Sequence, residues 1–351
     1  MDLQQLGMAI PSLDESAMAL ARQRQNDLTK PAGSLGRLED LSIQLAGITG
    51  DPRPVVERKA VIVMAGDHGV ARQGVSAYPP EVTPQMVMNF LAGGAAINVL
   101  ARQAGARVAI VDVGVAADLG DRPSLIGRKV AYGTADLTKG PAMTAEQATQ
   151  AIQVGLDVLA AEYEAGLDLV ATGDMGIGNT TSSSAIIAAL TGLPPVRVIG
   201  RGTGVDEAGL ARKVEAVEAA LAVNRPDPKD AFDVLRKVGG FEIAGLVGVI
   251  IGAASRRVPV VIDGFISGAA AVIAAGIAPG VKPYLIASHR SVEIGHSAML
   301  DLLGLQPIFD LGLQLGEGTG AALAFNVVDA AARILNEMAT FAEAGVSEKE
   351  E

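Results

Sequence analysis

The chain has no cysteine and no tryptophan among its 351 residues, and its aromatic residues are only four Tyr and seven Phe. Without cysteine, disulfides, thiolate catalysis and cysteine-ligated metal sites are excluded. Long apolar runs are also missing, because Gly or Pro interrupts each stretch before it reaches membrane-spanning length. The beginning, "MDLQQLGMAIPSLDES", lacks a basic region followed by an apolar run. We therefore expect a cytoplasmic protein that has no membrane contact.

Positive charge is in short supply, since the net charge is -11. DNA, RNA and anionic membranes reward clusters of Lys and Arg, so we expect no nucleic-acid or membrane partner. A phosphorylated small molecule needs only a few local donors and is not excluded. Hydrophobic residues make up 49% of the chain, which is enough for a substantial core.

Short apolar runs that end in polar or Gly residues recur along the chain and predict strands. Five are clear, and a weaker sixth, 195–204, contains "PVRVIGRGTG". The clear runs are 59–69, 107–114, 168–176, 258–264 and 282–290. Helical segments lie between most of them, and the runs do not alternate apolar with polar residues. We expect an α/β fold with a parallel sheet buried by helices on both faces.

Helices are also predicted before the first strand. Residues 12–28 are amphipathic, with Ser12 as the expected N-cap and Glu15 completing a capping box. A second helix is expected from about Gly36 to Ile48. Helices at the two chain ends can pack together, so we expect a small helical domain from 1–50 and 325–351. The α/β domain then comprises 51–324 and carries the active site.

Ligands of open α/β sheets bind beyond the carboxyl ends of the strands. Six loops of this sequence converge there, and they are "GDHG", "GDMGIGN", "GRGTG", "DGF", "SHRS" and "GEGTG". The second continues into "TTSSS", where a helix begins. Such a start suits a phosphate or ribose, although Ser and Thr also cap helices without any ligand. No complete dinucleotide fingerprint is present, which disfavours NAD.

Several other residues can be interpreted either as ligand contacts or as ordinary structural residues. Lys213, off the apolar stripe of the helix after "GRGTG", either reaches back to an anion or is a solvated surface lysine. Tyr78 and Pro79 either form a flat wall for a planar ring or pack within their own domain. Gln85 lies nearby, in the first turn of a helix whose start is predicted at Thr83.

The histidines His68, His289 and His296 lie near the predicted edge loops. None has the i, i+4 spacing of a helical zinc site, so we expect hydrogen bonding rather than a metal. No nucleophile elbow supports acyl-enzyme chemistry.

Glu317 lies between glycines just before an apolar helix pattern, where an anion-binding loop would normally exclude an acid. Burial raises the pKa of such a carboxyl and a helix dipole lowers it. This balance suits a general base that takes a proton from a heteroaromatic N–H. Asp67, Asp174 and Asp263 also lie in the edge loops, where helix capping is the simpler interpretation for an Asp.

Ten motifs in order along residues 10–340 resemble the nicotinate-nucleotide–dimethylbenzimidazole phosphoribosyltransferases. They are "KPAGSLGRLE", "GDHGV", "GVSAYPPEVT", "GGAAINVLA", "GDMGIGNTT", "GRGTG", "GGFEIAGLVG", "DGFISGAAA", "SHRSVEIGH" and "LGEGTGAALA". The resemblance implies a homodimer with a six-stranded parallel Rossmann-like sheet and a small helical domain. It implies transfer of phosphoribose from nicotinate mononucleotide to 5,6-dimethylbenzimidazole, giving α-ribazole 5′-phosphate and nicotinate for the lower ligand of cobalamin. Neither a metal nor an organic cofactor is implied.

The same resemblance assigns residues to roles. Glu317 is the general base and Asp174 supports catalysis. The benzimidazole side comprises Ser76, Tyr78, Pro79, Gln85, Met175 and Leu315. The nucleotide side comprises Gly176, Asn179, Thr180, Gly202, Gly204, Lys213, Asp263 and Ser291.

The chain departs from the family pattern at two positions. The family commonly has Glu where Asp174 stands and Arg where Gln314 stands. Other acceptors, such as adenine, plain benzimidazole or phenols, stay open from sequence alone. Two other functions are alternatives. One is a nucleotide-dependent oxidoreductase or kinase, although the dinucleotide fingerprint and the Walker loop are missing from this sequence. The other is a non-catalytic binder of azoles or nucleotides.

Overall fold

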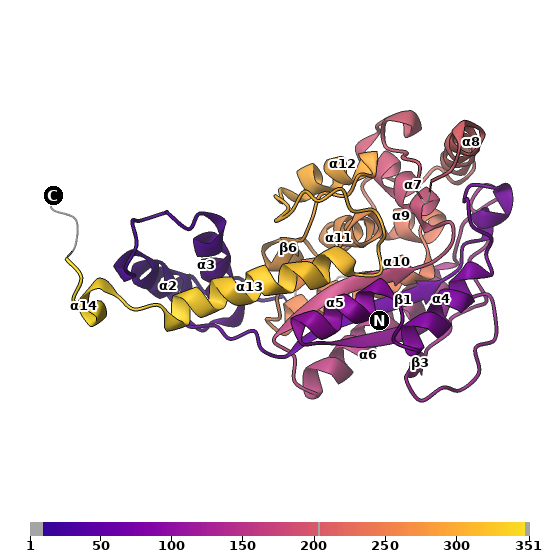
Figure 1. Cartoon of the computed structure of the whole chain (residues 1–351). Helices are drawn as coiled ribbons and strands as arrows, with labels where there is room; N and C mark the ends of the chain where they lie inside the picture. Colours follow the sequence, from indigo (N-terminus) through magenta and orange to yellow (C-terminus); the bar gives the residue numbers. More distant parts are fainter. Residues whose placement is uncertain (1–9, 203, 348–351) are drawn as a thin grey trace.

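The computed structural model describes residues 10–202 and 204–347, and within them the chain forms a six-stranded sheet (Figure 1). The strand order is β3-β2-β1-β4-β5-β6, and every adjacent pair is parallel. The strands are β1 Lys59–Gly66, β2 Ala106–Gly114, β3 Leu125–Gly127, β4 Leu169–Met175, β5 Val260–Ile262 and β6 Leu285–Ala287. The expected six-stranded parallel α/β fold is confirmed.

One strand prediction was wrong. Of the predicted run 195–204, residues 195–202 and 204 form no strand; they begin with the short 3-10 turn η2, Pro195–Arg197. Consecutive prolines offer no N–H to a sheet, and Gly202 has a positive φ of 57° that no strand residue adopts. The sixth strand is instead β3, whose three residues are only partly buried and lie in no apolar run.

Alternate residues of β1 face two different apolar clusters. Ala60, Ile62 and Met64 pack toward one, while Val61 and Val63 pack toward the other. Both faces are covered by helices, as the unbroken apolar runs predicted. The helices are α2 Glu15–Asp27, α3 Arg37–Thr49, α4 Val82–Leu91, α5 Ala96–Ala104, α6 Ala145–Glu164, α7 Asn179–Thr191, α8 Glu207–Asn224, α9 Ala231–Val238, α10 Phe241–Ser255, α11 Phe265–Ile277, α12 Ile294–Leu303, α13 Thr319–Glu337 and α14 Phe341–Ala344.

The first described helix does not start where its sequence indicated. Asp14, not Ser12, is the N-cap, and its Oδ1 accepts a hydrogen bond of 2.9 Å from the Ala17 N–H. Helix α2 therefore begins at Glu15, and the expected capping box does not form. The cap moves because Asp14 stands three residues before an N–H that needs an acceptor.

Helices α2, α3 and α14 lie with the C-terminal part of α13 at one end of the molecule (Figure 1). Ala17 and Ala21 of α2, Ile43 and Ala46 of α3, and Leu335 of α13 share a small apolar cluster. This packing supports a helical domain built from 1–50 and 325–351, while the division itself stays a prediction. Residues 1–9 and 348–351 of that domain lie outside the described residues.

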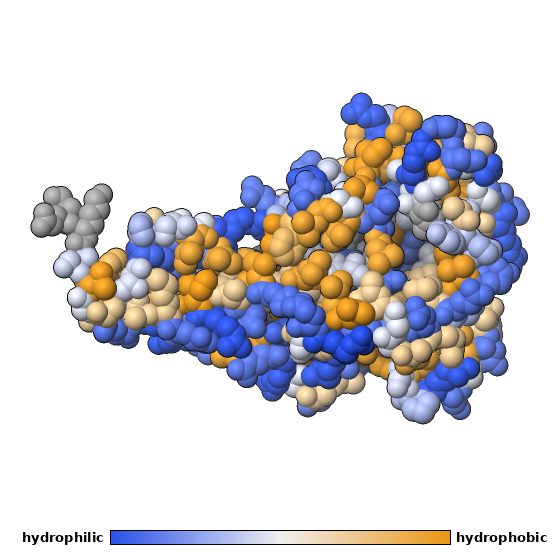
Figure 2. All heavy atoms as spheres, in the orientation of Figure 1, coloured by the Kyte–Doolittle hydropathy of each residue, from blue (hydrophilic) through white to orange (hydrophobic). Residues whose placement is uncertain are grey.

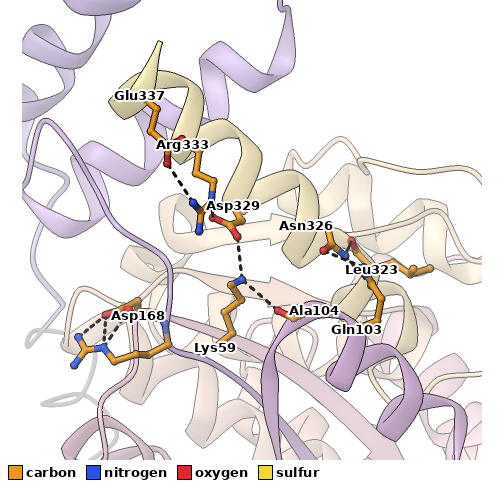
Figure 3. Close-up of polar contacts among 10 residues, drawn as sticks. Lys59, Gln103, Ala104, Asp168, Leu323, Asn326, Asp329, Arg333 and Glu337 are labelled. Atoms are coloured by element: carbon orange, nitrogen blue, oxygen red, sulfur yellow. Dashed lines mark hydrogen bonds and ion pairs between the residues drawn. The ribbon is translucent and has the colours of Figure 1, made fainter.

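Helix α13 connects this end with the sheet. Figure 3 shows Lys59, the first residue of β1, between the Asp329 carboxylate of α13 and the Ala104 carbonyl of α5. Its Nζ lies 3.1 Å from Asp329 Oδ2 and 3.2 Å from Ala104 O. In the part of the chain that the structure describes, no helix is long and apolar enough to cross a bilayer.

Candidate active site

A cavity of about 350 Å³ opens at the carboxyl ends of the strands. Segments that are distant in sequence line it, including the turn after β4, the residues after β5 and β6, and the loop before α13. Its lining residues are Tyr78, Val82, Met86, Asp174, Met175, Gly176, Ile177, Asn179, Thr180, Gly202, Gly264, Phe265, Ile266, His289, Ser291, Glu293, Gln314, Leu315, Gly316 and Glu317. This is the position where parallel sheets bind their ligands.

Most of the residues assigned from the sequence meet in this one cavity. They are Tyr78, Asp174, Met175, Gly176, Asn179, Thr180, Gly202, Ser291, Leu315 and Glu317. Their common location is a property of the structure, whereas their individual roles stay predictions.

The remaining assigned residues do not line the cavity. Ser76 accepts a hydrogen bond from the Tyr78 N–H at 3.1 Å, so it shapes the loop that carries Tyr78. Pro79, Gln85 and Gly204 are exposed. Met86 lines the cavity in place of Gln85 because α4 begins at Val82, and side chains four residues apart share one helix face.

Lys213 and Asp263 lie behind the cavity wall. Lys213 is 1% exposed, and its Nζ donates 3.1 Å hydrogen bonds to Thr180 Oγ1 and to the Gly200 carbonyl. Of the two interpretations of this lysine, the solvated one was wrong. Burial lowers its pKa, and the negative charge of Glu293 opposes that shift.

The loop that carries Glu317 has three successive residues with positive φ: 83° at Gly316, 63° at Glu317 and 92° at Gly318. This region is unfavourable for a side chain other than that of glycine, so neighbouring groups must hold the loop. Asp263 does so by accepting hydrogen bonds from the N–H groups of Gly318 at 3.1 Å and Ala321 at 3.0 Å.

Gly173, near the end of β4, makes room for the same loop. A Cβ at this position would lie only 2.5 Å from the Glu317 carbonyl oxygen. Backbone is difficult to displace, so the close approach of the two segments requires a glycine at this point.

The Glu317 side chain is 5% exposed, and its Oε2 accepts a 3.3 Å hydrogen bond from the Ile97 N–H. Ile97 is in the first turn of α5, so the dipole that favours the carboxylate comes from α5, not from the following α13. Burial nevertheless raises the pKa of Glu317; the Ile97 N–H opposes the shift and Asp263 adds to it.

Neighbouring acids are shifted further. Burial, followed by the charges of Asp263, Glu242 and Glu317, raises the pKa of Asp174 well above its ordinary value. Asn179 Nδ2 donates a 3.0 Å hydrogen bond to Asp174 Oδ2 and opposes that shift. Burial raises the pKa of Asp263 to about 7, although several backbone N–H groups favour its charged form. Burial therefore favours the protonated form of these acids more than water does.

Of the three histidines, only His289 lines the cavity. Burial lowers its pKa to about 4, so it is neutral. His296 is buried and accepts a 2.9 Å hydrogen bond from the Ser291 N–H through Nδ1. His68 joins Ser182 Oγ, 2.9 Å from Nδ1, to Glu242 Oε1, 2.5 Å from Nε2. Across residues 10–202 and 204–347, no three His, Asp or Glu side chains form a group that could hold a metal.

Two acids were not identified from the sequence. Glu242, at the start of α10, influences Asp174, and Glu293 lines the cavity. Both lie in recognised motifs, but neither stands out by spacing. Glu293 Oε1 accepts a 2.8 Å hydrogen bond from the Gly202 N–H, a residue that is 91 positions away.

Comparison with known proteins gives a consistent result. A family profile described as "Phosphoribosyltransferase" matches residues 10–346. The chain is 63% identical over 342 residues to the nicotinate-nucleotide–dimethylbenzimidazole phosphoribosyltransferase of Chloroflexus aggregans, and 64% identical over 342 residues to that of Roseiflexus sp.; each alignment covers 97% of both chains.

Solved structures agree. A crystal structure of the same-named enzyme from Thermus thermophilus superposes with a TM-score of 0.91 at 48% identity, covering 96% of this chain and 100% of that one. Both the sequence relationship and the fold therefore extend over nearly the whole length. The chain belongs to the nicotinate-nucleotide–dimethylbenzimidazole phosphoribosyltransferase family.

Proposed function

We propose that the protein transfers phosphoribose from nicotinate mononucleotide to 5,6-dimethylbenzimidazole, with Glu317 as the general base. The observation that carries this proposal is a buried carboxylate of raised pKa in the wall of a cavity lined by apolar side chains and by polar groups around Gly202. Tyr78, Met86 and Leu315 supply apolar surface for a flat ring. Gly202, Thr180 and Ser291 supply N–H and hydroxyl donors for a phosphate.

The reaction needs alignment and removal of one proton. Positive charge develops at the ribosyl C1′ as nicotinate leaves, in the manner of other glycosyl transfers. The azole attacks from the opposite face through the ring nitrogen that has a lone pair. Its second nitrogen then becomes acidic, and Glu317 takes that proton. The product is α-ribazole 5′-phosphate, because attack opposite the leaving group converts the β bond into an α bond.

Asp174 has a supporting role in this proposal. Its raised pKa favours the protonated form, in which one carboxyl oxygen donates. Oδ2 is already occupied by the Asn179 amide. A protonated Asp174 adds no negative charge next to Glu317, so a single carboxylate acts as the base. Gly176 and Asn179 belong to the same turn and complete the nucleotide side.

The direct test is turnover of nicotinate mononucleotide with 5,6-dimethylbenzimidazole, with the product identified by mass. We expect α-ribazole 5′-phosphate and nicotinate in equal amounts. A competition among 5,6-dimethylbenzimidazole, plain benzimidazole and adenine in one reaction then ranks the acceptors. Binding of both substrates without any product would contradict the proposal and leave a binding protein.

We propose a homodimer as the working state. Exposed apolar side chains occur on two segments next to the cavity, joined by a backbone hydrogen bond from Val292 to Leu313. They are Val292, Ile294, Leu311 and Leu315, each 49% to 60% exposed. Figure 2 shows hydrophobic side chains gathered across this side of the molecule, over α12 and α13. Apolar surface of this kind favours association, and light scattering of the purified chain measures its mass directly.

A further inference from the structure

Glu293 is a carboxylate without a function in the reaction described above. It follows β6 by a short loop and directly precedes α12. The residue is 5% exposed and lines the cavity next to Gly202. A buried acid beside groups that are suited to a phosphate is unexpected, because two anions repel each other.

The contacts of Glu293 are those that a phosphate oxygen would make. Its Oε1 accepts the 2.8 Å hydrogen bond from the Gly202 N–H. Its Oε2 lies against Gly200, where an added Cβ would come within 2.4 Å. Within the described residues this buried Oε2 has no hydrogen-bond partner. The carboxylate is therefore held at one oxygen only.

Positive charge near this carboxylate comes from the Lys213 ammonium; burial lowers its pKa, and Glu293 opposes that shift. Arg201 is next to Gly202 in sequence, but it pairs with Glu207, whose side chain is 81% exposed. An incoming phosphate would have to share Lys213 and the Gly202 N–H with Glu293. A charged donor favours one anion strongly and a second one much less.

We propose that the Glu293 carboxylate occupies the 5′-phosphate position in the free enzyme as an internal anion that the substrate must displace. The inference rests on the proposed function, since it takes the polar groups around Gly202 as the phosphate subsite. Displacement needs side-chain rotation, and Glu293 is the N-cap residue of α12 whose side chain makes no capping hydrogen bond. The device keeps the Gly202 N–H paired, and a negative charge near Lys213, when the site is empty. It also selects against free phosphate, which has no ribose contacts to offset the displacement.

The decisive variant is Glu293→Gln, which keeps the shape and the acceptor for Gly202 but removes the charge. We expect the Kd for inorganic phosphate, measured by calorimetry, to fall about tenfold. The KM for nicotinate mononucleotide should fall by a similar factor, with kcat changed less than about twofold. Glu215→Gln is the matched control: it removes the same charge from an exposed position of α8 and should leave both constants unchanged.

A second variant separates charge from shape. Glu293→Asp retains the negative charge, so its phosphate affinity should stay close to that of the wild type. The inference is overturned if Glu293→Gln binds phosphate no more tightly than the wild type does. It is also overturned if Glu293→Asp binds phosphate as tightly as Glu293→Gln does. Thermal melts of each variant show whether it is folded. If the wild type turns over but Glu293→Gln gains no phosphate affinity, this inference alone is defeated. If the wild type forms no product, the proposed function is defeated.

Discussion

The two ends of the central strands differ in whether their acidic side chains form ion pairs with Lys or Arg. At the amino end, Lys59 pairs with Asp329, and Arg58 pairs with Asp168 (Figure 3). At the carboxyl end, Asp174, Asp263 and Glu317 approach one another. Among residues 10–202 and 204–347, no Lys or Arg forms an ion pair with any of these three acids. The pKa is lowered for Asp168 and raised for all three acids of the cavity.

The difference shows which end the fold uses for stability and which for chemistry. A paired charge keeps its ordinary protonation state and anchors the helix that it contacts. An unpaired, buried carboxyl costs stability, but burial raises its pKa above the ordinary value, which suits a general base. Helix α13 connects the two ends, because the loop that carries Glu317 precedes it and Asp329 lies farther along it.

The largest expected effect is at the unpaired end. Glu317→Gln removes the proton acceptor while keeping the size and the hydrogen bond from Ile97, so kcat should fall by about 10²–10⁴-fold. Single-turnover product formation measures this, and azole binding by calorimetry should persist. The wild-type rate should also fall as the pH drops through the raised pKa of Glu317. Glu337→Gln, at an exposed acid at the end of α13, is the control, and a Glu317→Gln variant with near wild-type turnover would contradict the assignment.

The next largest effect is at the paired end. Lys59→Met leaves Asp329 and the Ala104 carbonyl without their shared donor, and both ends of this pair are mostly buried. Unfolding in urea should show a loss of about 2 kcal/mol. The kcat should be unchanged because the cavity lies at the carboxyl ends of the strands, whereas Lys59 lies at the amino end of β1. A fall in kcat alongside the loss of stability, measured on the folded variant, would show that the two ends are not independent.

The pH dependence of stability should separate the ends by its sign. Asp263, with its pKa raised to about 7, binds a proton in the folded state that the unfolded chain releases near its ordinary value of 3.8. The free energy of unfolding therefore falls as pH rises between these values, by up to about 1.4 kcal/mol per pH unit. Asp263→Asn should flatten this slope in urea titrations over that range.

Asp168 provides the opposite case for the same experiment. Burial alone would raise its pKa, but hydrogen bonds from Arg58 lower it. Its stabilising effect is complete above the ordinary value and is lost as the pH falls below it. Asp168→Asn should therefore change the slope in acid only. A slope that is identical in the wild type and in Asp263→Asn would contradict the raised pKa of Asp263.

The smallest effect is expected at an exposed pair. Arg333 bonds Asp329 and Glu337 across the surface of α13, and its side chain is 54% exposed (Figure 3). Arg333→Met should cost less than about 0.5 kcal/mol in urea unfolding, because solvent screens such pairs. Comparison with Lys59→Met measures how much burial contributes at the paired end. Losses of the same size would show that burial does not set the strength of these contacts.

Local sequence predicted the elements that have strong patterns. The apolar runs at β1, β2 and β4 and the helix after Gly36 were found, because burial on both faces and helical periodicity leave clear signals. The strand β3 was missed, and the sixth strand was predicted at 195–204 instead. The runs that contain β5 and β6 are apolar and buried, whereas β3 is only partly buried, so its pairing with β2 leaves no local apolar pattern.

The site divides in the same way. Loops that follow strands were expected to meet, and Asp174, Gly202, Ser291 and Glu317 do line one cavity. The exposed position of Gln85 and the inward position of Met86 depended on where α4 begins. Glu293 was missed because its contact with Gly202 joins two loops that no local spacing relates.

By itself, the sequence determined the parallel α/β class, the motifs that resemble one family and the candidacy of Glu317. Only the tertiary structure decided that the amide next to the Glu317 carboxylate belongs to Ile97, that Asp263 anchors its loop and that Glu293 accepts the Gly202 N–H. Patterns along a chain report which face of an element is buried, since that depends on neighbours within a few residues. Protonation and hydrogen bonding depend on groups that folding brings from remote positions into one low-dielectric space.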